Sequence, residues 1–207
     1  MFRDPRQDTE AVREWKAETL PELKKEAKRE GRTLFYADES SFLLNPKALR
    51  TYWLKNEDLE IDSWDKQFQT YGVCGAISTE GHFVHIHQQE SFKGKHMVAF
   101  LKLLLDEISG KVTLVWDGAS IHGCRPVRKF LESLPEGRLK LVRQPTYSPE
   151  LNASEQVWNY LKNVLLRNRV FKNIDALAKA VAKALQTMEL KTNVIKKFFH
   201  HPEVAFY

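Results

Sequence analysis

The alternation of apolar and polar positions predicts strands early in the chain and helices between the later strands. Residues 9–30 have helical spacing, with a break expected near Pro21 and a stop at Gly31. Farther along, short apolar runs predict strands, and apolar residues three or four positions apart predict helices. The expected strands are 32–38, 67–78, 81–87, 111–117 and 138–144, with a further short strand at 47–55, and the expected helices are 95–108, 124–134, 152–167 and 174–190.

The order of these elements predicts an α/β fold with a mixed sheet. The strands at 67–78 and 81–87 are joined by a short turn and should pair antiparallel, whereas the later strands alternate with helices, as parallel βα units do. We therefore expect an antiparallel meander followed by parallel βα units, with helices against the sheet. In such sheets ligands collect outside the carboxyl ends of the strands.

Composition is that of an ordinary globular protein. The chain has 207 residues, of which 43% are hydrophobic and 29% charged, enough for one domain with a proper core. No apolar stretch approaches the roughly 20 residues of a membrane span, and the first residues lack the apolar core of a secretory signal. Cys74 and Cys124 lie outside any C-x-x-C pattern, so we expect reduced thiols in a cytoplasmic protein that does not bind a membrane.

Basic residues form two groups that flank the acidic residues discussed below. The net charge of +5 permits a polyanionic partner without requiring one, and a solvated helix face explains either group alone. The arrangement as a whole favours a substrate that carries phosphates. The groups are Lys24, Lys25, Lys28, Arg29 and Arg32 near the amino end, and Lys162, Arg167, Arg169, Lys172, Lys179 and Lys183 in the carboxyl third.

Two aspartates each end a strongly apolar run. Asp38 ends "TLFYAD" and Asp117 ends "TLVWD". Either one alone is explained as a turn residue, but both would project at the same edge if the two strands lie side by side and parallel. Two close carboxylates suit Mg²⁺, and a third would allow two metals about 3.5–4 Å apart that serve an in-line phosphoryl displacement.

The stretch "QPTYSPELNASEQVW" offers two candidates for the third carboxylate. If Ser148 is the N-cap, Glu150 lies in the first helical turn, where the helix dipole favours it. If Asn152 is the N-cap, Glu155 falls at the third position and resembles half of a capping box. Local helix physics does not separate the two glutamates, since each is explicable without catalysis.

Three segments together resemble the catalytic core of the mariner-like DDE transposases, most closely the bacterial insertion-sequence branch. They are "YADES" with Asp38, "VWDGASIH" with Asp117 and His122, and "PTYSPELNASEQVW" with Glu155 and Trp158. The resemblance covers about residues 32–167 and implies a ribonuclease-H-like fold. It also implies that the glutamate three positions after the Leu-Asn pair, Glu155, is the third metal ligand and that the acid after Ser-Pro is not.

The sequence departs from the family pattern at three positions. Gly118 stands where the family often has Asn, and Ala153 and Ser154 stand where Pro and a hydrophobic residue are common. None of these changes removes a carboxylate, so the catalytic interpretation is kept. The expected domains are a helical lead-in at 1–31, the DDE catalytic domain at 32–190 and a C-terminal tail at 191–207.

The resemblance implies metal-dependent DNA cleavage and strand transfer at transposon ends, with TA as the preferred target. The cofactor would be Mg²⁺, with Mn²⁺ able to replace it. The partners would be double-stranded DNA of the transposon ends and target, a second copy of the chain on that DNA, and a separate helix-turn-helix part, because only about 30 residues precede the first strand. Such an enzyme would act in the bacterial cytoplasm at the nucleoid.

Five further residues are candidates for DNA contact, each with a structural alternative. His122 contacts a phosphate or orients a neighbouring group; Tyr147 and Ser148 lie near substrate or form a turn; Lys162 is expected to contact the DNA backbone, and Arg167 belongs to the same basic group. Trp158 favours core packing over base stacking, and Glu39 should face away from Asp38. His85 and His87 share one strand face, as a chelating pair or as two half-exposed polar positions.

Two other functions compete with transposition. One is a ribonuclease-H-like DNA endonuclease, domesticated or not, that cleaves DNA without moving an element. The other is a DNA-binding or regulatory derivative that has kept the scaffold but not the chemistry. The presence of Asp38, Asp117 and Glu155 argues against the second.

Overall fold

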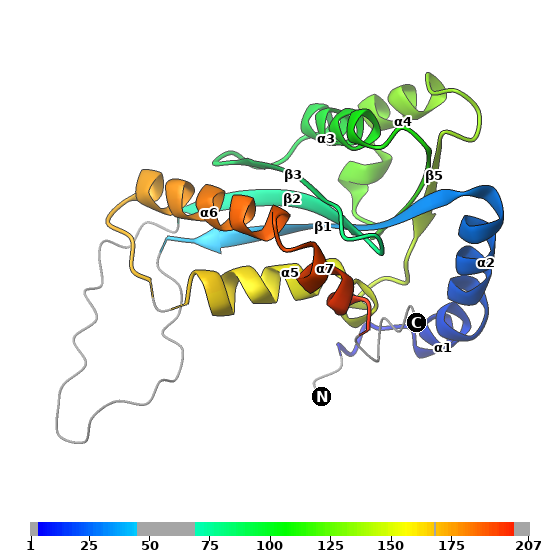
Figure 1. Ribbon diagram of the computed structural model, residues 1–207, viewed down its shortest axis with the longest axis horizontal. Coiled ribbons are helices and arrows are strands. Elements are labelled where there is room, and N and C mark those ends of the chain that lie inside the picture. Colours follow the sequence, from blue (N-terminus) through cyan, green and yellow to red (C-terminus); the bar gives the residue numbers. More distant parts are fainter. Residues whose placement is uncertain (1–3, 45–68, 168, 201–207) are drawn as a thin grey trace.

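The computed structural model describes residues 4–44, 69–167 and 169–200, which form one sheet with helices on both faces (Figure 1). The strands are β1 (Arg32–Leu43), β2 (Thr70–Ser78), β3 (Phe83–Gln88), β4 (Lys111–Trp116) and β5 (Leu139–Arg143). The helices are α1 (Thr9–Glu14), α2 (Leu20–Glu30), α3 (Gly94–Glu107), α4 (Arg125–Glu132), α5 (Ser154–Tyr160), α6 (Ile174–Glu189) and α7 (Thr192–Phe198). The expected strand at 47–55 lies outside the described residues.

The sheet is mixed, as the order of elements predicts. Its strand order is β3-β2-β1-β4-β5. β2 pairs antiparallel with both β1 and β3, whereas β4 pairs parallel with β1 and with β5. The meander and the parallel βα units therefore meet at β1, which is the central strand.

β1 is longer than the sequence predicts. The expected strand ends at Asp38, but β1 continues to Leu43 because β2 pairs with it along its whole second half, from Phe35 opposite Ser78 to Leu43 opposite Thr70. The polar residues after Asp38 are typical of a strand end. In the structure the backbone groups of these residues pair with β2, because ladder hydrogen bonds do not depend on whether the side chains are polar or apolar.

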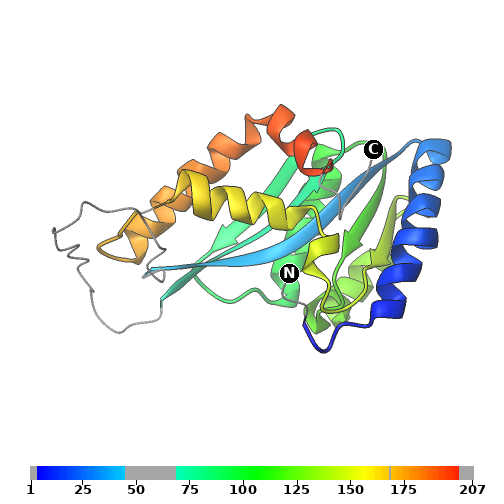
Figure 2. The same ribbon diagram turned by 90° about the horizontal axis from the view of Figure 1, so that it is seen from below.

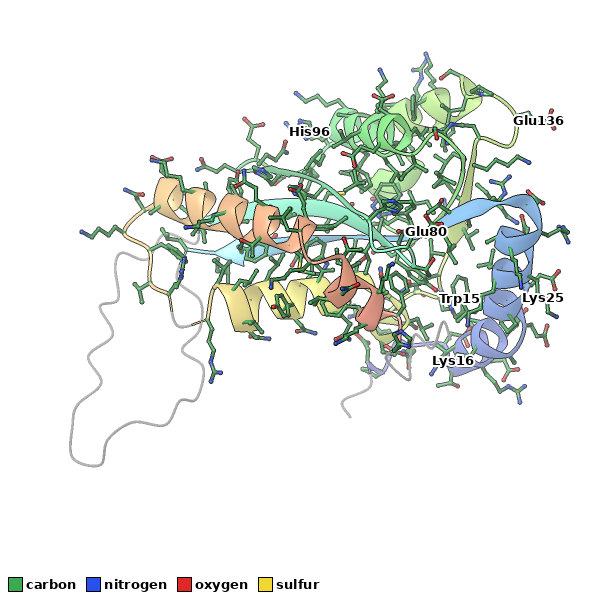
Figure 3. The ribbon with its side chains drawn as sticks, in the orientation of Figure 1. Trp15, Lys16, Lys25, Glu80, His96 and Glu136 are labelled. Atoms are coloured by element: carbon green, nitrogen blue, oxygen red, sulfur yellow. The ribbon has the colours of Figure 1, made fainter. Side chains whose placement is uncertain are left out.

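Two apolar layers cover the two faces of the sheet. α3 and α4 pack on one face around Phe35, Phe100 and Leu114, and α5, α6 and α7 pack on the other around Tyr36, Trp158 and their neighbours (Figures 1 and 2). Side chains of successive β1 residues enter opposite layers, as strand geometry requires. Exposed charged side chains such as Lys25 and Glu136 point outward (Figure 3).

The N-terminal helices form one continuous rod with no break at Pro21. A π-helical turn, Trp15–Thr19, joins α1 to α2, and Pro21, the second residue of α2, follows this turn directly. Gly31 ends α2 in the left-handed conformation at φ 60°, as expected. A similar π turn, Leu161–Leu165, extends α5. The helix expected at 152–167 therefore runs from Ser154 to Leu165, and it begins two residues later than predicted.

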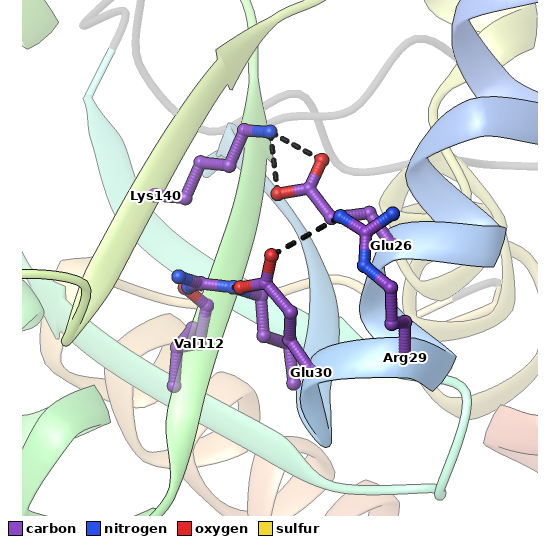
Figure 4. A network of polar contacts seen from close by, with 6 residues as sticks. Glu26, Arg29, Glu30, Val112 and Lys140 are labelled. Carbon is purple, nitrogen blue, oxygen red and sulfur yellow. Dashed lines mark hydrogen bonds and ion pairs between the residues drawn. The ribbon is translucent and has the colours of Figure 1, made fainter.

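Ion pairs hold the end of α2 against the sheet (Figure 4). Lys140 on β5 binds Glu26, and Arg32 donates to Glu30 over 2.8 Å and to the carbonyl of Val112 over 3.1 Å. These contacts lie at the end of the sheet where β1 and β4 begin, away from the cleft described below. Within the described ranges, no helix has the length and apolar character of a membrane span.

Candidate active site

Asp38 and Asp117 lie at the same edge of the sheet. β1 and β4 run parallel, and the last residues paired between them are Tyr36 and Val115. Each aspartate comes two residues after this pair, so the register carries both past the end of β4 together. Asp38 remains within β1, and Asp117 begins the loop that follows β4. The structure thus brings together the two aspartates that the sequence predicts to be neighbours.

Glu155 comes from α5, which two buried polar side chains bind to β1. The amide of Asn152 donates to the carbonyl of Ala37 over 2.9 Å, and the hydroxyl of Ser154 donates to the carbonyl of Tyr36 over 2.7 Å. Both acceptors immediately precede Asp38 in β1. The start of α5, with Glu155 in its first turn, is therefore fixed relative to the first aspartate.

The start of α5 differs from both alternatives drawn from the sequence. Pro149–Leu151 form a separate 3-10 turn, and Ser148 gives that turn no side-chain cap. Asn152 accepts a hydrogen bond from the backbone of Ser154 over 3.0 Å, two residues on, instead of capping a third position. Because its amide is already bonded to β1, Asn152 serves as a link to the sheet, and Glu155 makes no capping bond.

A cleft of about 360 Å³ joins the three carboxylates. Asp38, Asp117 and Glu155 all line it, together with the loop after Asp117 and the segment 144–149 that leads from β5 to α5. Glu150 does not line it; its carboxylate accepts a hydrogen bond from Gln7 over 2.6 Å on the other side of the loop. The two glutamates of the motif therefore have different surroundings.

Asp38 and Glu155 sit in a poorly solvated part of the cleft. Burial raises the pKa of Asp38 to about 8, the charge of Glu155 adds to this, and a hydrogen bond of 2.9 Å from Trp158 Nε1 opposes it. Burial also raises the pKa of Glu155, against the pull of Lys162. The ammonium of Lys162 donates to Ser40 Oγ over 2.8 Å. Without a cation, the surroundings therefore disfavour the state in which both carboxylates are ionised.

Asp117 is held by a chain of polar contacts from behind the cleft. Its Oδ1 accepts the backbone N–H of Ala119 and lies 2.9 Å from Nδ1 of His122, whose Nε2 lies 2.9 Å from Glu39. Burial alone would lower the pKa of His122, but the two acids outweigh it and raise that pKa to about 9. The imidazole also stacks on Trp116, with 3.7 Å between ring centroids.

The residues proposed for DNA contact fall into two groups. Tyr147 and Ser148 line the cleft, and Lys162 lies beside Glu155. His122 is 7% exposed and contacts Asp117, which favours its alternative role of orienting a neighbour. Arg167 is exposed beyond the π turn of α5 and does not line the cleft.

His85 and His87 share a face of β3, where they meet α6. His85 Nε2 lies 2.9 Å from Glu189, and His87 Nδ1 lies 2.7 Å from the hydroxyl of Tyr71. Burial lowers the pKa of both histidines. The pair therefore joins β3 to its neighbours and takes no part in the cleft.

Sequence reasoning misses three contacts that build the site. It predicts only packing for Trp158, marks Ser154 only as a departure from the family pattern, and gives no role to Gln7. A small hydroxyl residue in place of the hydrophobic residue common in the family is a signal for Ser154, because it can bond a strand carbonyl. The sequence carries no such signal for Gln7, which reaches Glu150 from 143 positions away.

The three carboxylates offer the hard oxygen atoms that Mg²⁺ and Mn²⁺ prefer. Over the described residues, no group of three His, Cys, Asp or Glu side chains is arranged to hold a metal ion, and Asp117 is turned toward His122. Asp38 and Glu155, whose pKa values both rise with burial and whose charges repel, fit a divalent cation, since Mg²⁺ commonly takes only one or two protein carboxylates.

Comparison with known proteins agrees with this geometry. Residues 33–178, which span the sheet, the cleft and α5, match the family described as DDE superfamily endonuclease. A 39 kDa protein of insertion element IS630 from Shigella sonnei is 27% identical over 189 residues, which are 90% of this chain and 52% of that protein. The chain thus spans about half the length of this curated relative.

Solved structures of the Mos1 mariner transposase share the fold. Its paired-end complex with Mg superposes with a TM-score of 0.68 at 16% identity, over 97% of this chain and 61% of that one. Its catalytic domain with Raltegravir and Mn gives 0.59 at 14% identity, over 99% and 96%. The ribonuclease-H-like fold and the resemblance to mariner-like transposases of the insertion-sequence branch are confirmed, and the chain belongs to the DDE superfamily endonucleases.

Proposed function

We propose that this chain is the catalytic domain of a DNA transposase in which Asp38, Asp117 and Glu155 hold the divalent cations of the reaction. One observation carries the proposal: three carboxylates from β1, the end of β4 and α5 line a single cleft in a member of an endonuclease family. A bound Mg²⁺ or Mn²⁺ would supply Lewis acidity to the phosphodiester and lower the pKa of water.

The protein's own side chains would position and balance this chemistry. Asp38 and Glu155 supply the negative charge that binds a cation, and Trp158 fixes the orientation of Asp38. His122, held by Glu39, directs Asp117 from the rear of the cleft. No side-chain nucleophile is required, because water attacks the phosphodiester in cleavage and a freed 3′-hydroxyl attacks the target DNA in strand transfer.

The substrate of this reaction would be double-stranded DNA at the ends of a mobile element, followed by target DNA. Support comes from the Mos1 structures, whose names describe paired-end and strand transfer complexes, and from the insertion-element relative. From the family resemblance we further propose that a separate helix-turn-helix part recognises the ends and that two copies act together on DNA at the bacterial nucleoid. Lys162 and the other basic residues near α5 would contact the DNA backbone.

Cleavage by matched variants tests the proposal. Nicking of a supercoiled plasmid in Mg²⁺ or Mn²⁺ is expected to fall in Asp38→Asn, Asp117→Asn and Glu155→Gln by more than the roughly 10–100-fold that changes beside a metal ligand cost. Glu150→Gln, five residues before Glu155, is the control and should keep near-normal activity. Full activity in Glu155→Gln together with loss in Glu150→Gln would refute the assignment.

A second assay separates transposition from its competitors. Duplexes that carry the inverted repeats flanking the reading frame, already cut at their 3′ ends, are incubated with the chain and a target plasmid. Joined products support a transposase, nicking without joining identifies a DNA endonuclease, and metal-independent binding without either reaction identifies a regulatory derivative.

A further inference from the structure

The segment that leads into α5 contains a strained tyrosine at the cleft. Tyr147 has φ 54°, and in the described part of the chain it is the one residue other than glycine with a positive φ. A bulky residue in this conformation costs about 1–3 kcal/mol and persists only where its surroundings hold it. Tyr147 lines the cleft with the carboxylates and is 47% exposed, whereas every other Phe, Tyr and Trp in the described ranges is buried or half-buried.

Gln7, from the segment before α1, holds this loop from outside. Its Nε2 lies 3.1 Å from the carbonyl oxygen of Tyr147, 3.1 Å from Ser148 Oγ and 2.6 Å from a carboxylate oxygen of Glu150. From inside, Gln144, which is 5% exposed, donates to the carbonyl of Ser148 over 2.8 Å. The backbone around Tyr147 is thus fixed from both sides.

Arg6 covers one face of the tyrosine ring. Its guanidinium carbon lies 4.1 Å from the ring centroid, and the group is itself fixed by Asp4 through bonds of 3.0 and 2.8 Å. The dark blue segment before α1 lies beside the loop before α5 in both ribbon views (Figures 1 and 2). A cation on one face leaves the ring rigid and its exposed surface available for a second planar partner.

We propose that Tyr147 is a stacking platform for an unpaired nucleobase next to the phosphodiester in the carboxylate cleft, and that Arg6 and Gln7 are positioning residues that hold it there. This rests on the proposed function, since a DNA strand whose phosphate reaches the carboxylates must pass the same rim. Base–aromatic stacking is tolerant of sequence and is worth enough to stabilise an unpaired base.

The phenol hydroxyl of Tyr147 could instead donate a hydrogen bond to a phosphate. Two substitutions distinguish this contact from stacking of a base on the ring. Tyr147→Phe keeps the ring and loses the hydroxyl, whereas Tyr147→Ala loses both. The probe is a duplex with a 3′ single-stranded overhang whose first unpaired base is 2-aminopurine, bound by the 207-residue chain in Ca²⁺ to suppress cleavage. Fluorescence reports stacking of this base, and anisotropy reports affinity.

Stacking predicts quenching by the wild-type chain and by Tyr147→Phe, and loss of quenching with about 10- to 100-fold weaker binding in Tyr147→Ala. Gln7→Ala and Arg6→Ala should reduce quenching in part while leaving binding of a fully paired duplex unchanged, a split that general destabilisation would not give. Tyr147→Gly, which relieves the strain but removes the ring, should behave like Tyr147→Ala.

Three results would overturn the proposal. Equal quenching by Tyr147→Ala and by the wild-type chain would show that the base does not stack on Tyr147. Loss of quenching in Tyr147→Phe would assign the contact to the hydroxyl. Absence of quenching by a wild-type chain that cleaves DNA rejects the platform and leaves the proposed function intact. Asp117→Asn serves as the reverse control, because it should lose cleavage and keep quenching.

Discussion

Trp158 donates its indole N–H to Asp38 Oδ2 over 2.9 Å, so the helix that carries Glu155 also orients the first aspartate. Trp158 follows Glu155 by three positions, which places both side chains on one face of α5. The same ring is 3% exposed and packs in the layer between α5 and the sheet. One helix therefore sets the orientation of Asp38 and, through the charge of Glu155, contributes to its raised pKa.

Trp158→Phe is expected to lower metal-dependent DNA cleavage by about 10–100-fold with little loss of fold, because it removes the bond to Asp38 and keeps an aromatic ring. Initial nicking rates and circular dichroism check this. The matched control is Trp15→Phe, since the buried Nε1 of Trp15 has no hydrogen-bond partner among the described residues. A Trp158→Phe enzyme as active as the control would remove the orienting role.

Asp38 should make the metal-free protein less stable as pH rises. Its pKa is about 8 in the folded chain against an ordinary value of 3.8, so below pH 3.8 the group is protonated in both the folded and the unfolded state and has no effect. Between these two pKa values only the unfolded chain releases the proton, and folding stability falls. Asp38→Asn should therefore be more stable than wild type near pH 8, by on the order of a few kcal/mol, and should lose this advantage below pH 3.8.

Urea unfolding in a chelating buffer at several pH values measures this difference. Asp106→Asn, on the exposed side of α3, is the control and should follow the wild-type curve at every pH. A pH-independent gain in Asp38→Asn would mean that packing, and not the charge, is responsible.

Divalent cations should offset the loss of folding stability that ionisation of Asp38 and Glu155 causes in the metal-free protein. Mg²⁺ at about 100 times its Kd is expected to stabilise the chain by about 2.7 kcal/mol at mildly alkaline pH, seen as a rise in Tm. Asp38→Asn and Glu155→Gln should lose this response, and Glu150→Gln should retain it, since Glu150 is bonded to Gln7 outside the cleft. An equal rise in all variants would point to cation binding elsewhere on the chain.

Glu39 is expected to hold the charge on His122. The pKa of His122 is raised to about 9 in the folded chain. His122 therefore contributes stability that is complete below the usual histidine pKa of 6.5 and is lost as pH rises through 9. Glu39→Gln should lower the pKa of His122, followed by NMR titration of the imidazole, and reduce cleavage as Asp117 loses its support. An unchanged titration in Glu39→Gln would show that Asp117 alone sets the charge.

The shared edge of Asp38 and Asp117 could be predicted from two apolar runs that each end on an aspartate, on the condition that the two strands are parallel neighbours, and the choice of Glu155 came from the family resemblance. The limits of β1 could not, because they depend on pairing with β2 from Phe35 to Leu43. The different contacts of Glu150 and Glu155 could not be predicted either, because the hydrogen bond to Glu150 comes from Gln7, a residue far away in the sequence.

β1 extends past the end of β4, and near that point Asn152 and Ser154 donate hydrogen bonds to two successive carbonyls of β1, those of Ala37 and Tyr36. α5 therefore docks by two side-chain bonds whose position does not depend on how much chain lies between β4 and the helix. The 38-residue interval from Asp117 to Glu155 (155 − 117 = 38) is then free to lengthen or shorten in the α4 and β5 region without moving the third carboxylate. The distance in sequence between the acids is therefore a poor guide to the third carboxylate in this chain, and the Asn152 amide bonded to β1 is a better one.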